Sequence, residues 1–429
     1  MVLLIVTLLF TVVSITILFG TISPIARQLK MSHDLYSSKK SYFAADAGAE
    51  DAFYRMKNNI NISFPLSLSI DDSTVTITSS QISSTDREIF SQGVTDNNFR
   101  AILNDLTVTD GFAFNFAVQV GIGGLRMQND SDIIGNVYSN GSIDGDDENK
   151  NFILGDAVSA GSTGDIEQIH ATSSVYAHNV SESKVDRNAY YQTIDSHTIV
   201  TGTKYPNSPD QPLIEMPIAD TLLDQWETTA VGGGTITSPC PYIINNSVTL
   251  GPKKINCDVR IKDRNTVVTL SGVLWINGNL VIEDDSKFKV SDSVGNKSVP
   301  IIVKSTSDPS GNGKIDINNK PTFYGSETNG VPNPDSYVML VSRNIGAEIG
   351  NDVKAITAGN NVTGNLLLYA PHGKIELSNN VILREVTSYQ LTLKNNVQVY
   401  YSIGLAQPLF VSGPGGKWKI KRWKEGKHQ

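Results

Sequence analysis

The chain has 429 residues, a formal net charge of −8, and only 18% charged residues. The last 17 residues carry a local net charge of +5, so the rest of the chain is more acidic than the net charge indicates. An acidic body of this kind excludes nucleic-acid binding through a broad basic surface.

The chain begins with a long uncharged segment. Met1–Ala26 holds no charged residue, and Arg27 opens an ordinary polar sequence. An apolar run of this length can cross a bilayer as one helix, which needs about 20 residues. The run is too long, and lacks the basic start, for a secretory signal that is cleaved off. The sequence therefore predicts a retained, single-pass transmembrane helix.

A helical pattern continues beyond this segment. Ile25, Leu29, Tyr36, Phe43 and Ala47 recur at intervals of 4 and 7 residues, with charged residues between them. The spacing predicts that the membrane helix runs on as an amphipathic stalk to Lys57, so that residues 1–59 form one element of about 80 Å. Pro24 is expected to bend it, because proline removes a backbone hydrogen bond.

The stalk carries a motif. The run Ser41–Glu50, followed by Ala52 and Tyr54, resembles the AFxAAxAGxExA signature of PilX-type minor pilins. The long helix with an internal proline also resembles the helix of type IV pilins and pseudopilins. The resemblance extends from the N-terminus to about Lys57. It departs from the family at two points: no basic leader ending in glycine precedes Met1, and Ile5 stands near the position where major pilins carry a glutamate.

This resemblance implies a subunit of a type IV pilus-like fibre or pseudopilus. Its partners would be other pilin-like subunits and the pilus assembly machinery, with the helix in the cytoplasmic membrane and the body outside the cytoplasm. Charge counting alone gives the opposite orientation, because Arg27, Lys30 and Lys39 follow the helix. We follow the resemblance and place the body outside the cytoplasm.

Small residues on a helix allow close contact with other helices in a membrane or a fibre core. The residues expected to serve helix packing and assembly are Gly20, Pro24, Phe43, Ala44, Ala45, Asp46, Ala47, Gly48 and Glu50. A bulky residue at Ala45 or Gly48 is expected to block entry into a fibre and to leave the isolated head folded.

Residues 60–111 read as a small β region. Thr74–Thr78 alternates strictly, and Arg87–Phe90 and Phe99–Leu103 are further strand candidates. Gln92–Gly93 and Asp96–Asn98 are the expected turns. Strands packed on the upper half of a long helix would suit the pilin resemblance.

From Phe112 onward the sequence repeats itself. Ile134–Gly141 reappears as Leu154–Gly161, and more weakly as Ser174–Asn179. Asparagine pairs at 360–361, 379–380 and 395–396 continue a similar spacing, and Asn tolerates the left-handed backbone that a corner needs. Short strands at this period predict a right-handed parallel β-helix, or β-solenoid. The alternative is an antiparallel sandwich, which prefers longer strands and more closely spaced turn signals.

The expected solenoid has two blocks, at residues 112–200 and 240–411. The linker at 201–239 contains one predicted helix, Asp220–Thr229, because Ile218, Leu222, Leu223 and Trp226 share a face. Residues 412–429 form a basic tail with Trp418 and Trp423, which is expected to cap the open end of the solenoid. The alternative for this tail is a membrane or polyanion contact.

Cys240 and Cys257 lie 17 positions apart. A disulfide between them would suit an extracytoplasmic protein, and two unpaired buried thiols are the alternative. Two cysteines without a nearby histidine do not make a zinc site.

The sequence offers little chemistry. Gly121–Gly124 lacks the helix that a dinucleotide fingerprint needs, and the six histidines are scattered. Asp144–Glu148 reads as a solvated acidic loop, with calcium binding as the alternative, and Asp284–Asp285 reads as a turn. We therefore expect no catalytic residue, cofactor or metal.

The interpretation is a mainly β structural protein, a minor pilin-like fibre component that displays a β-solenoid head for adhesion or assembly priming. A surface or glycan ligand on the head would fit adhesion. Two alternatives remain: a membrane-anchored β-helix enzyme acting on polysaccharide, and a cytoskeletal polymer like the bactofilins, which are also β-solenoids.

Overall fold

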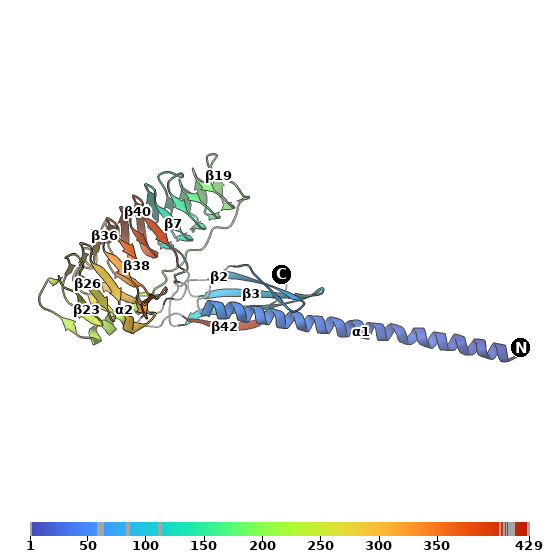
Figure 1. Cartoon of the computed structure of the whole chain (residues 1–429). Coiled ribbons are helices and arrows are strands. Elements are labelled where there is room, and N and C mark those ends of the chain that lie inside the picture. Colours follow the sequence, from blue (N-terminus) through green and yellow to red (C-terminus); the bar gives the residue numbers. More distant parts are fainter. Residues whose placement is uncertain are drawn as a thin grey trace. The chain divides into compact units, whose positions relative to one another are not determined.

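The computed structural model describes residues 2–57, 64–82, 86–109, 114–402, 405, 408, 410 and 417–426 (Figure 1). They form two compact units. The first unit contains the described residues of Met1–Ile82, Asp86–Thr107 and Trp418–Gln429, and the second contains those of Val108–Lys417. Mainly β structure with parallel sheets, as predicted, dominates the second unit.

The first unit is built on one long helix, α1 (Val2–Lys57). The predicted single helix ending at Lys57 is confirmed, and Pro24 lies inside it without ending it. The predicted transmembrane span is not confirmed: within the part of the chain that the structure describes, no helix is both long enough and apolar enough to cross a membrane.

The C-terminal half of α1, which ends at Lys57, packs on a five-stranded sheet. Its strands follow the order β1-β2-β3-β4-β42, and the neighbours among β1 to β4 are antiparallel. The strands are β1 (Leu66–Ile70), β2 (Ser73–Gln81), β3 (Asp86–Thr95), β4 (Asn98–Thr109) and β42 (Lys417–Gly426). The three predicted strand segments lie in β2, β3 and β4, and the turn at Asp96–Asn98 is confirmed by the β3–β4 hairpin.

The other predicted turn is wrong. Gln92 and Gly93 lie inside β3, opposite Ala101 and Arg100. Gly93 is needed there because a Cβ atom would lie 2.2 Å from the Ser41 carbonyl oxygen and 2.8 Å from the Ala45 nitrogen. Glycine in this strand therefore marks the closest approach of helix and sheet, and not a turn.

The basic tail is not a solenoid cap, which corrects the expectation for residues 412–429. The described part of the tail is β42, the last strand of the small sheet, beside β4. Arg422 Nε donates to Asp105 Oδ2 over 2.6 Å, and Arg100 Nη1 lies 3.0 Å from Glu425 Oε1. Trp418 is buried, so its apolar ring and the ion pair of Arg422 with Asp105 on β4 explain why a basic strand joins this sheet.

The second unit is a stack of coils in which each strand pairs in parallel with the strand one coil later. Inward-facing Val, Ile and Leu side chains from every coil form one continuous buried core. Three strands per coil make three faces. The first face contains β5 (Val118–Val120), β8 (Val137–Ser139), β11 (Ala157–Ser159), β14 (Val175–Tyr176), β17 (Ala189–Tyr191), β20 (Lys204–Pro206), β21 (Thr235–Ile236), β24 (Lys253–Ile255), β27 (Leu274–Ile276), β30 (Val299–Val303) and β35 (Val338–Ser342).

The second face contains β6 (Leu125–Gln128), β9 (Ile143–Asp144), β12 (Asp165–Glu167), β15 (Asn179–Ser181), β18 (Thr193–Ile194), β22 (Tyr242–Ile244), β25 (Val259–Ile261), β28 (Leu280–Ile282), β31 (Ile315–Ile317) and β36 (Lys354–Gly359). Two long strands, β38 (Leu366–Ser378) and β40 (Glu385–Lys394), extend across the first and second faces.

The third face is the 12-stranded sheet. It contains β7 (Asp132–Ile134), β10 (Phe152–Ile153), β13 (His170–Ala171), β16 (Lys184–Val185), β19 (Ile199–Val200), β23 (Val248–Leu250), β26 (Val267–Leu270), β29 (Lys287–Val290), β32 (Thr322–Tyr324), β37 (Thr363–Gly364), β39 (Ile382–Leu383) and β41 (Gln398–Tyr400). A short hairpin of β33 (Glu327–Thr328) and β34 (Val331–Pro332) and a 3-10 turn, η1 (Asp292–Val294), occupy connections between coils.

The chain enters this stack in the middle. From β5 it winds outward to one end at β20, crosses to the other end, and winds back from β21 until it meets its own beginning. There β40 pairs with β5 and β6, and β41 pairs with β7, so that Val386 lies opposite Val118 and Val399 opposite Ile133. The two predicted blocks are therefore one continuous stack, and β20 and β21 lie inside the range expected to be linker.

Residues 207–219, which we call the strap, run back along the first face. Tyr138 Oη donates to the Pro212 carbonyl over 2.5 Å, and Asn140 exchanges hydrogen bonds of 3.0 and 2.7 Å with the backbone of Ile214. Tyr369 Oη donates to the Ile218 carbonyl over 2.7 Å. The strap thus contacts coils from both runs of the chain and ties them together.

The predicted helix in this region is confirmed as α2 (Asp220–Gly232). Its buried residues Leu223, Trp226 and Ala230 cover outward apolar side chains of the first face. Arg343 Nη1 lies 2.6 Å from Glu227 Oε1, which satisfies the charge of this nearly buried carboxylate.

The predicted asparagine corners are also confirmed. Asn360, Asn379 and Asn395 have φ values of 58°, 59° and 59°. Their side chains form a ladder, in which Asn395 Nδ2 donates to Asn379 Oδ1 over 2.9 Å and Asn379 Nδ2 donates to Asn360 Oδ1 over 3.2 Å. The Asn361, Asn380 and Asn396 side chains form a second ladder beside it.

The contact between α1 and its sheet gives a first prediction. Gly48→Leu should destabilise the first unit by about 1–3 kcal/mol, because a Cβ atom at Gly48 would lie 2.5 Å from Val75 Cγ1. Ala47→Leu, one position away on the exposed side of α1, should leave the free energy of unfolding unchanged. Denaturant unfolding of both variants measures this, and equal stability of the two would contradict the packing.

Candidate functional site

The candidate functional site lies on the side of α1 that faces away from its sheet. Ile25, Leu29, Tyr36, Phe43 and Tyr54 are 54%, 67%, 63%, 65% and 60% exposed. With Ala47 they form one stripe, which we call the outer face of α1. Large apolar side chains in a continuous exposed stripe mark a binding surface, because water is a poor environment for them.

Two open grooves lie on either side of Phe43, between α1 and the edges of the sheet. The first groove, of about 380 Å³, is lined by Tyr36, Lys39, Lys40, Phe43, Ala44, Ile70, Asp71 and Ser73. The second, of about 320 Å³, is lined by Leu35, Ser38, Lys39, Tyr42, Phe43, Arg100 and Glu425. Phe43 and Lys39 belong to both grooves, so Phe43 stands as a ridge between them.

Two of the cations at these grooves are paired within the unit. Lys40 Nζ lies 2.9 Å from Asp72 Oδ2, and this hydrogen bond raises the pKa of Lys40 and lowers the pKa of Asp72. Arg100 is paired with Glu425 in the second groove. Lys39, which lines both grooves, has no ion pair among the described residues, so an uncompensated cation remains at both grooves.

The structure divides the predicted assembly residues between two sides of α1. Ala44, Ala45 and Gly48 are buried against the chain's own sheet, with Ala45 fully covered. On the other side, exposed to solvent, are Phe43, Ala47 and Glu50, with Asp46 half-buried and Gly20 and Pro24 exposed. A bulky residue at Ala45 or Gly48 would therefore clash with the sheet of the first unit, and its expected effects on fibre entry and on the separate head stay predictions.

Polar contacts fix this orientation of α1. Ser37 Oγ donates to Asp96 Oδ2 over 2.7 Å, and Ser41 Oγ donates to the Asn98 carbonyl over 2.8 Å. Both serines lie on the buried side, at the turn between β3 and β4. The small residues and serines thus hold the sheet, and the large apolar residues are left on the outer face.

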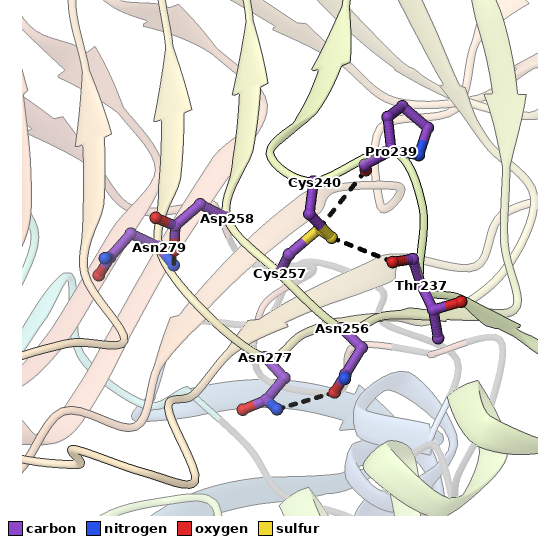
Figure 2. The surroundings of a disulfide bond; sticks show 8 residues. All are labelled: Thr237, Pro239, Cys240, Asn256, Cys257, Asp258, Asn277 and Asn279. Carbon is purple, nitrogen blue, oxygen red and sulfur yellow. Dashed lines mark hydrogen bonds between the residues drawn. A yellow bond between two sulfur atoms is a disulfide. The ribbon is translucent and has the colours of Figure 1, made fainter.

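The two cysteines form a disulfide in the second unit (Figure 2). Their Cα atoms are 5.8 Å apart, a normal separation for a disulfide. Cys240 lies in the coil that begins at β21, and Cys257 lies at the same corner one coil later, between β24 and β25. The bond therefore joins an end coil of the stack to its neighbour. Beside it, Asn277 Nδ2 donates to Asn256 Oδ1 over 2.9 Å.

The acidic positions in the second unit have structural partners. Asp146 Oδ1 accepts from Asn151 Nδ2 over 2.6 Å, and Asp147 Oδ1 accepts from the Asn149 nitrogen over 2.9 Å. Asp284 and Asp285 have φ values of 56° and 48° and occupy a turn, as predicted. Within the described residues no group of three or more His, Cys, Asp or Glu could hold a metal ion.

Sequence reasoning passed over two acidic features. Asp144 and Glu167 lie opposite each other on β9 and β12. Burial raises the pKa of Glu167, and repulsion from Asp165 and Asp144 adds to the rise. The only signal in the sequence is the repeat spacing that brings these strands together. Carboxylates on neighbouring coils are the kind of pair that the polysaccharide-active enzyme hypothesis requires.

The second feature is Glu385, a fully buried carboxyl group on β40. Thr387 Oγ1 donates to Glu385 Oε1 over 2.5 Å, and Glu385 Oε2 has no hydrogen-bond partner among the described residues. Burial raises its pKa well above the ordinary value of a glutamate. It lies where the two runs of coils meet, so its protonation bears on the stability of that junction.

Comparisons with known proteins add little. No family model matches the chain, and no curated protein matches it. The chain is similar to the solved structure of the competence-associated pilin ComZ from Thermus thermophilus, with 10% identity and a TM-score of 0.31. That alignment covers 91% of this chain and 98% of ComZ. A TM-score this low does not establish a shared fold.

The disulfide gives a second prediction. Replacing both Cys240 and Cys257 by serine should lower the free energy of unfolding of the second unit by about 3 kcal/mol, because the bond closes a loop of 17 residues in the unfolded chain. Hydrogen exchange should accelerate first in β21, β22 and β23. Unchanged exchange in these end strands would contradict a role for the disulfide in holding the end coil.

Glu385 gives a third prediction, on pH. The folded pKa lies above the unfolded one, so the stability linked to protonation is present below the unfolded pKa and is lost as pH rises through the folded pKa. Glu385→Gln, which cannot ionise, should be more stable than the parent at pH 8 and not at pH 4. Glu215→Gln, at an exposed position of the strap, is the matched control. A parent stability that does not fall between these pH values, relative to Glu385→Gln, would refute the assignment.

Proposed function

We propose that this protein is a structural subunit of a type IV pilus-like or pseudopilus-like fibre, in the manner of a PilX-type minor pilin. The outer face of α1 carries the proposal. Its large apolar side chains are more than half exposed within their own unit, and fibre assembly from helices would cover them. Beyond this stripe, α1 continues toward its N-terminus with exposed apolar residues such as Leu4, Leu8 and Phe10.

In this proposal the two parts of the chain have different tasks. The first unit enters the fibre through α1, and its partners are other pilin-like subunits and the assembly machinery. The second unit is displayed, for adhesion to a surface or glycan, or for priming of assembly. The disulfide supports a body located outside the cytoplasm, because disulfides persist in oxidising compartments and are rare in the cytosol.

The proposal gives a fourth prediction. In cells with the assembly machinery, Phe43→Glu should remove the protein from the sheared fibre fraction, because a carboxylate on the outer face would be buried without a partner. Ile122→Glu makes the same change at a residue of the second unit that is 67% exposed, and should leave fibre incorporation normal. Both variants should have parental unfolding curves.

Normal incorporation of the folded Phe43→Glu variant would overturn the proposal. The two alternatives give different observations. A polysaccharide-active enzyme would cleave a polysaccharide as purified protein and lose that activity in Glu167→Gln. A cytoskeletal polymer would be protected from protease added to spheroplasts, whereas the proposed subunit would be degraded.

A further inference from the structure

The second face of the stack carries a row of cations, although the chain as a whole is acidic. The strands β36, β38 and β40 lie side by side there (Figure 1), and β6 is the next strand after β40. Side chains on these strands alternate between the core and the outside, and the outward ones include Lys354, Lys374, Lys394 and Arg126. Lys314, which is exposed, directly precedes the neighbouring strand β31. We call these five residues the basic strip.

The three lysines in the middle of the strip lie around two carboxylates. Lys354 Nζ is 2.6 Å from Glu376 Oε1, and Lys394 Nζ is 3.0 Å from Glu376 Oε2. Lys374 Nζ is 2.6 Å from Asp352 Oδ1. The hydrogen bond from Lys374 lowers the pKa of Asp352, and the charges of Lys354 and Lys394 lower it further. All three ammonium groups are therefore close enough to act on one added anion.

The two ends of the strip are unpaired. Neither Lys314 nor Arg126 has an ion pair among the described residues, and both are exposed. With Glu376, Asp352 and the outward Asp316, the strip has three carboxylates for its five cations, so it keeps a net positive charge.

The carboxylate that pairs with Lys374 is replaceable. The Asp352 side chain is 84% exposed, whereas that of Lys374 is only 16% exposed. An exposed ion pair contributes little to stability, so an anion from outside can take the place of Asp352 on Lys374 at small cost. Asp144 on β9 stands opposite Arg126 and limits the anion-binding part of the face to the strands from β31 to β6.

The shape and composition of the strip favour an extended, hydrophilic anion. From β31 to β6 it spans about 19 Å, at about 4.8 Å per strand, so one polymer with regularly spaced anions can contact several of its cations at once. Ser378, Gln390 and Gln128 lie outward among the cations and offer hydrogen bonds to sugar hydroxyls. No large apolar side chain of β36, β38, β40 or β6 is exposed, which disfavours a membrane surface.

We propose that the basic strip binds an acidic polysaccharide whose carboxylates follow the axis of the stack. This inference rests on the proposed function, in which the second unit is displayed for adhesion, and it names the class of glycan. Lys374 exchanges Asp352 for a sugar carboxylate, and Lys314 and Arg126 each bind a further one through charge-assisted hydrogen bonds.

Fluorescence polarisation with a labelled alginate oligosaccharide, which is a chain of uronic acids, tests this on the purified full chain. The parent should bind alginate and should not bind uncharged dextran. Arg126→Gln with Lys314→Gln should weaken alginate binding about tenfold, because two unpaired cations are lost. Arg187→Gln with Lys204→Gln is the matched control, since it removes two exposed cations without ion pairs from the coils near the β20 end. It should leave the affinity unchanged.

A variant with the opposite effect completes the test. Asp352→Asn should tighten alginate binding about threefold, because Lys374 loses the carboxylate that competes with the ligand. Asp72→Asn removes an equally exposed carboxylate from a lysine pair of the first unit, with Lys40, and should leave the affinity unchanged.

The outcomes separate this inference from the proposed function. Absence of alginate binding, or equal weakening by both double variants, would overturn the inference. So would equally tight binding of double-stranded DNA or anionic phospholipid vesicles through the same residues. A chain that enters the fibre fraction but fails these tests leaves the fibre role standing. A chain that binds alginate through the strip but is absent from the fibre fraction contradicts the proposed function and leaves the binding site standing.

Discussion

The close approach of α1 to β3 is the constraint on which the account of this protein depends. Gly93 in β3 and Gly48 in α1 leave no room for a side chain, since a Cβ atom at Gly93 would lie 2.2 Å from Ser41 of α1. A Cβ atom at Gly48 would lie 2.5 Å from Val75 of β2 and 2.8 Å from Ser91 of β3. At this close approach, only small residues can therefore face the sheet. The helix must turn its large residues outward there, and Phe43 is exposed as a result. The exposed apolar side chains of the outer face therefore follow from the packing of α1 on its own sheet.

The second unit is organised by a different constraint, which is the parallel pairing between β40 and β5. A chain that starts in the middle of a stack must return to that point, or the middle coils would keep unpaired edges. The strap and α2 connect β20 at one end of the stack to β21 at the other end. Tyr138 and Tyr369 hold the strap to coils of both runs. The disulfide then joins an end coil to its neighbour, where a coil has only one neighbouring coil to pair with.

Much of this architecture is readable from the sequence, because it is local. The spacing of Ile25, Leu29 and Tyr36 predicts the helix, and the asparagine pairs predict the corners, since both patterns report on residues close in the chain. The features that the sequence did not predict depend on contacts between residues that are far apart in the chain. Nothing in the spacing says which side of α1 meets the sheet, and a motif centred on Ala45 and Gly48 suits packing within a unit as well as packing between subunits. The return of β42 to β4 depends on distant partners such as Asp105, whose ion pair with Arg422 spans 317 positions of the chain.

Thiol labelling of residue 36 in the fibre is the most direct measurement of the central claim, that the outer face of α1 is an assembly surface. A Tyr36→Cys variant would be treated with a water-soluble maleimide, once as dispersed protein and once in intact sheared fibres. The account predicts rapid labelling of the dispersed protein and strong protection in the fibre. Equal labelling in both states would contradict it, because the outer face would then remain open to solvent after assembly.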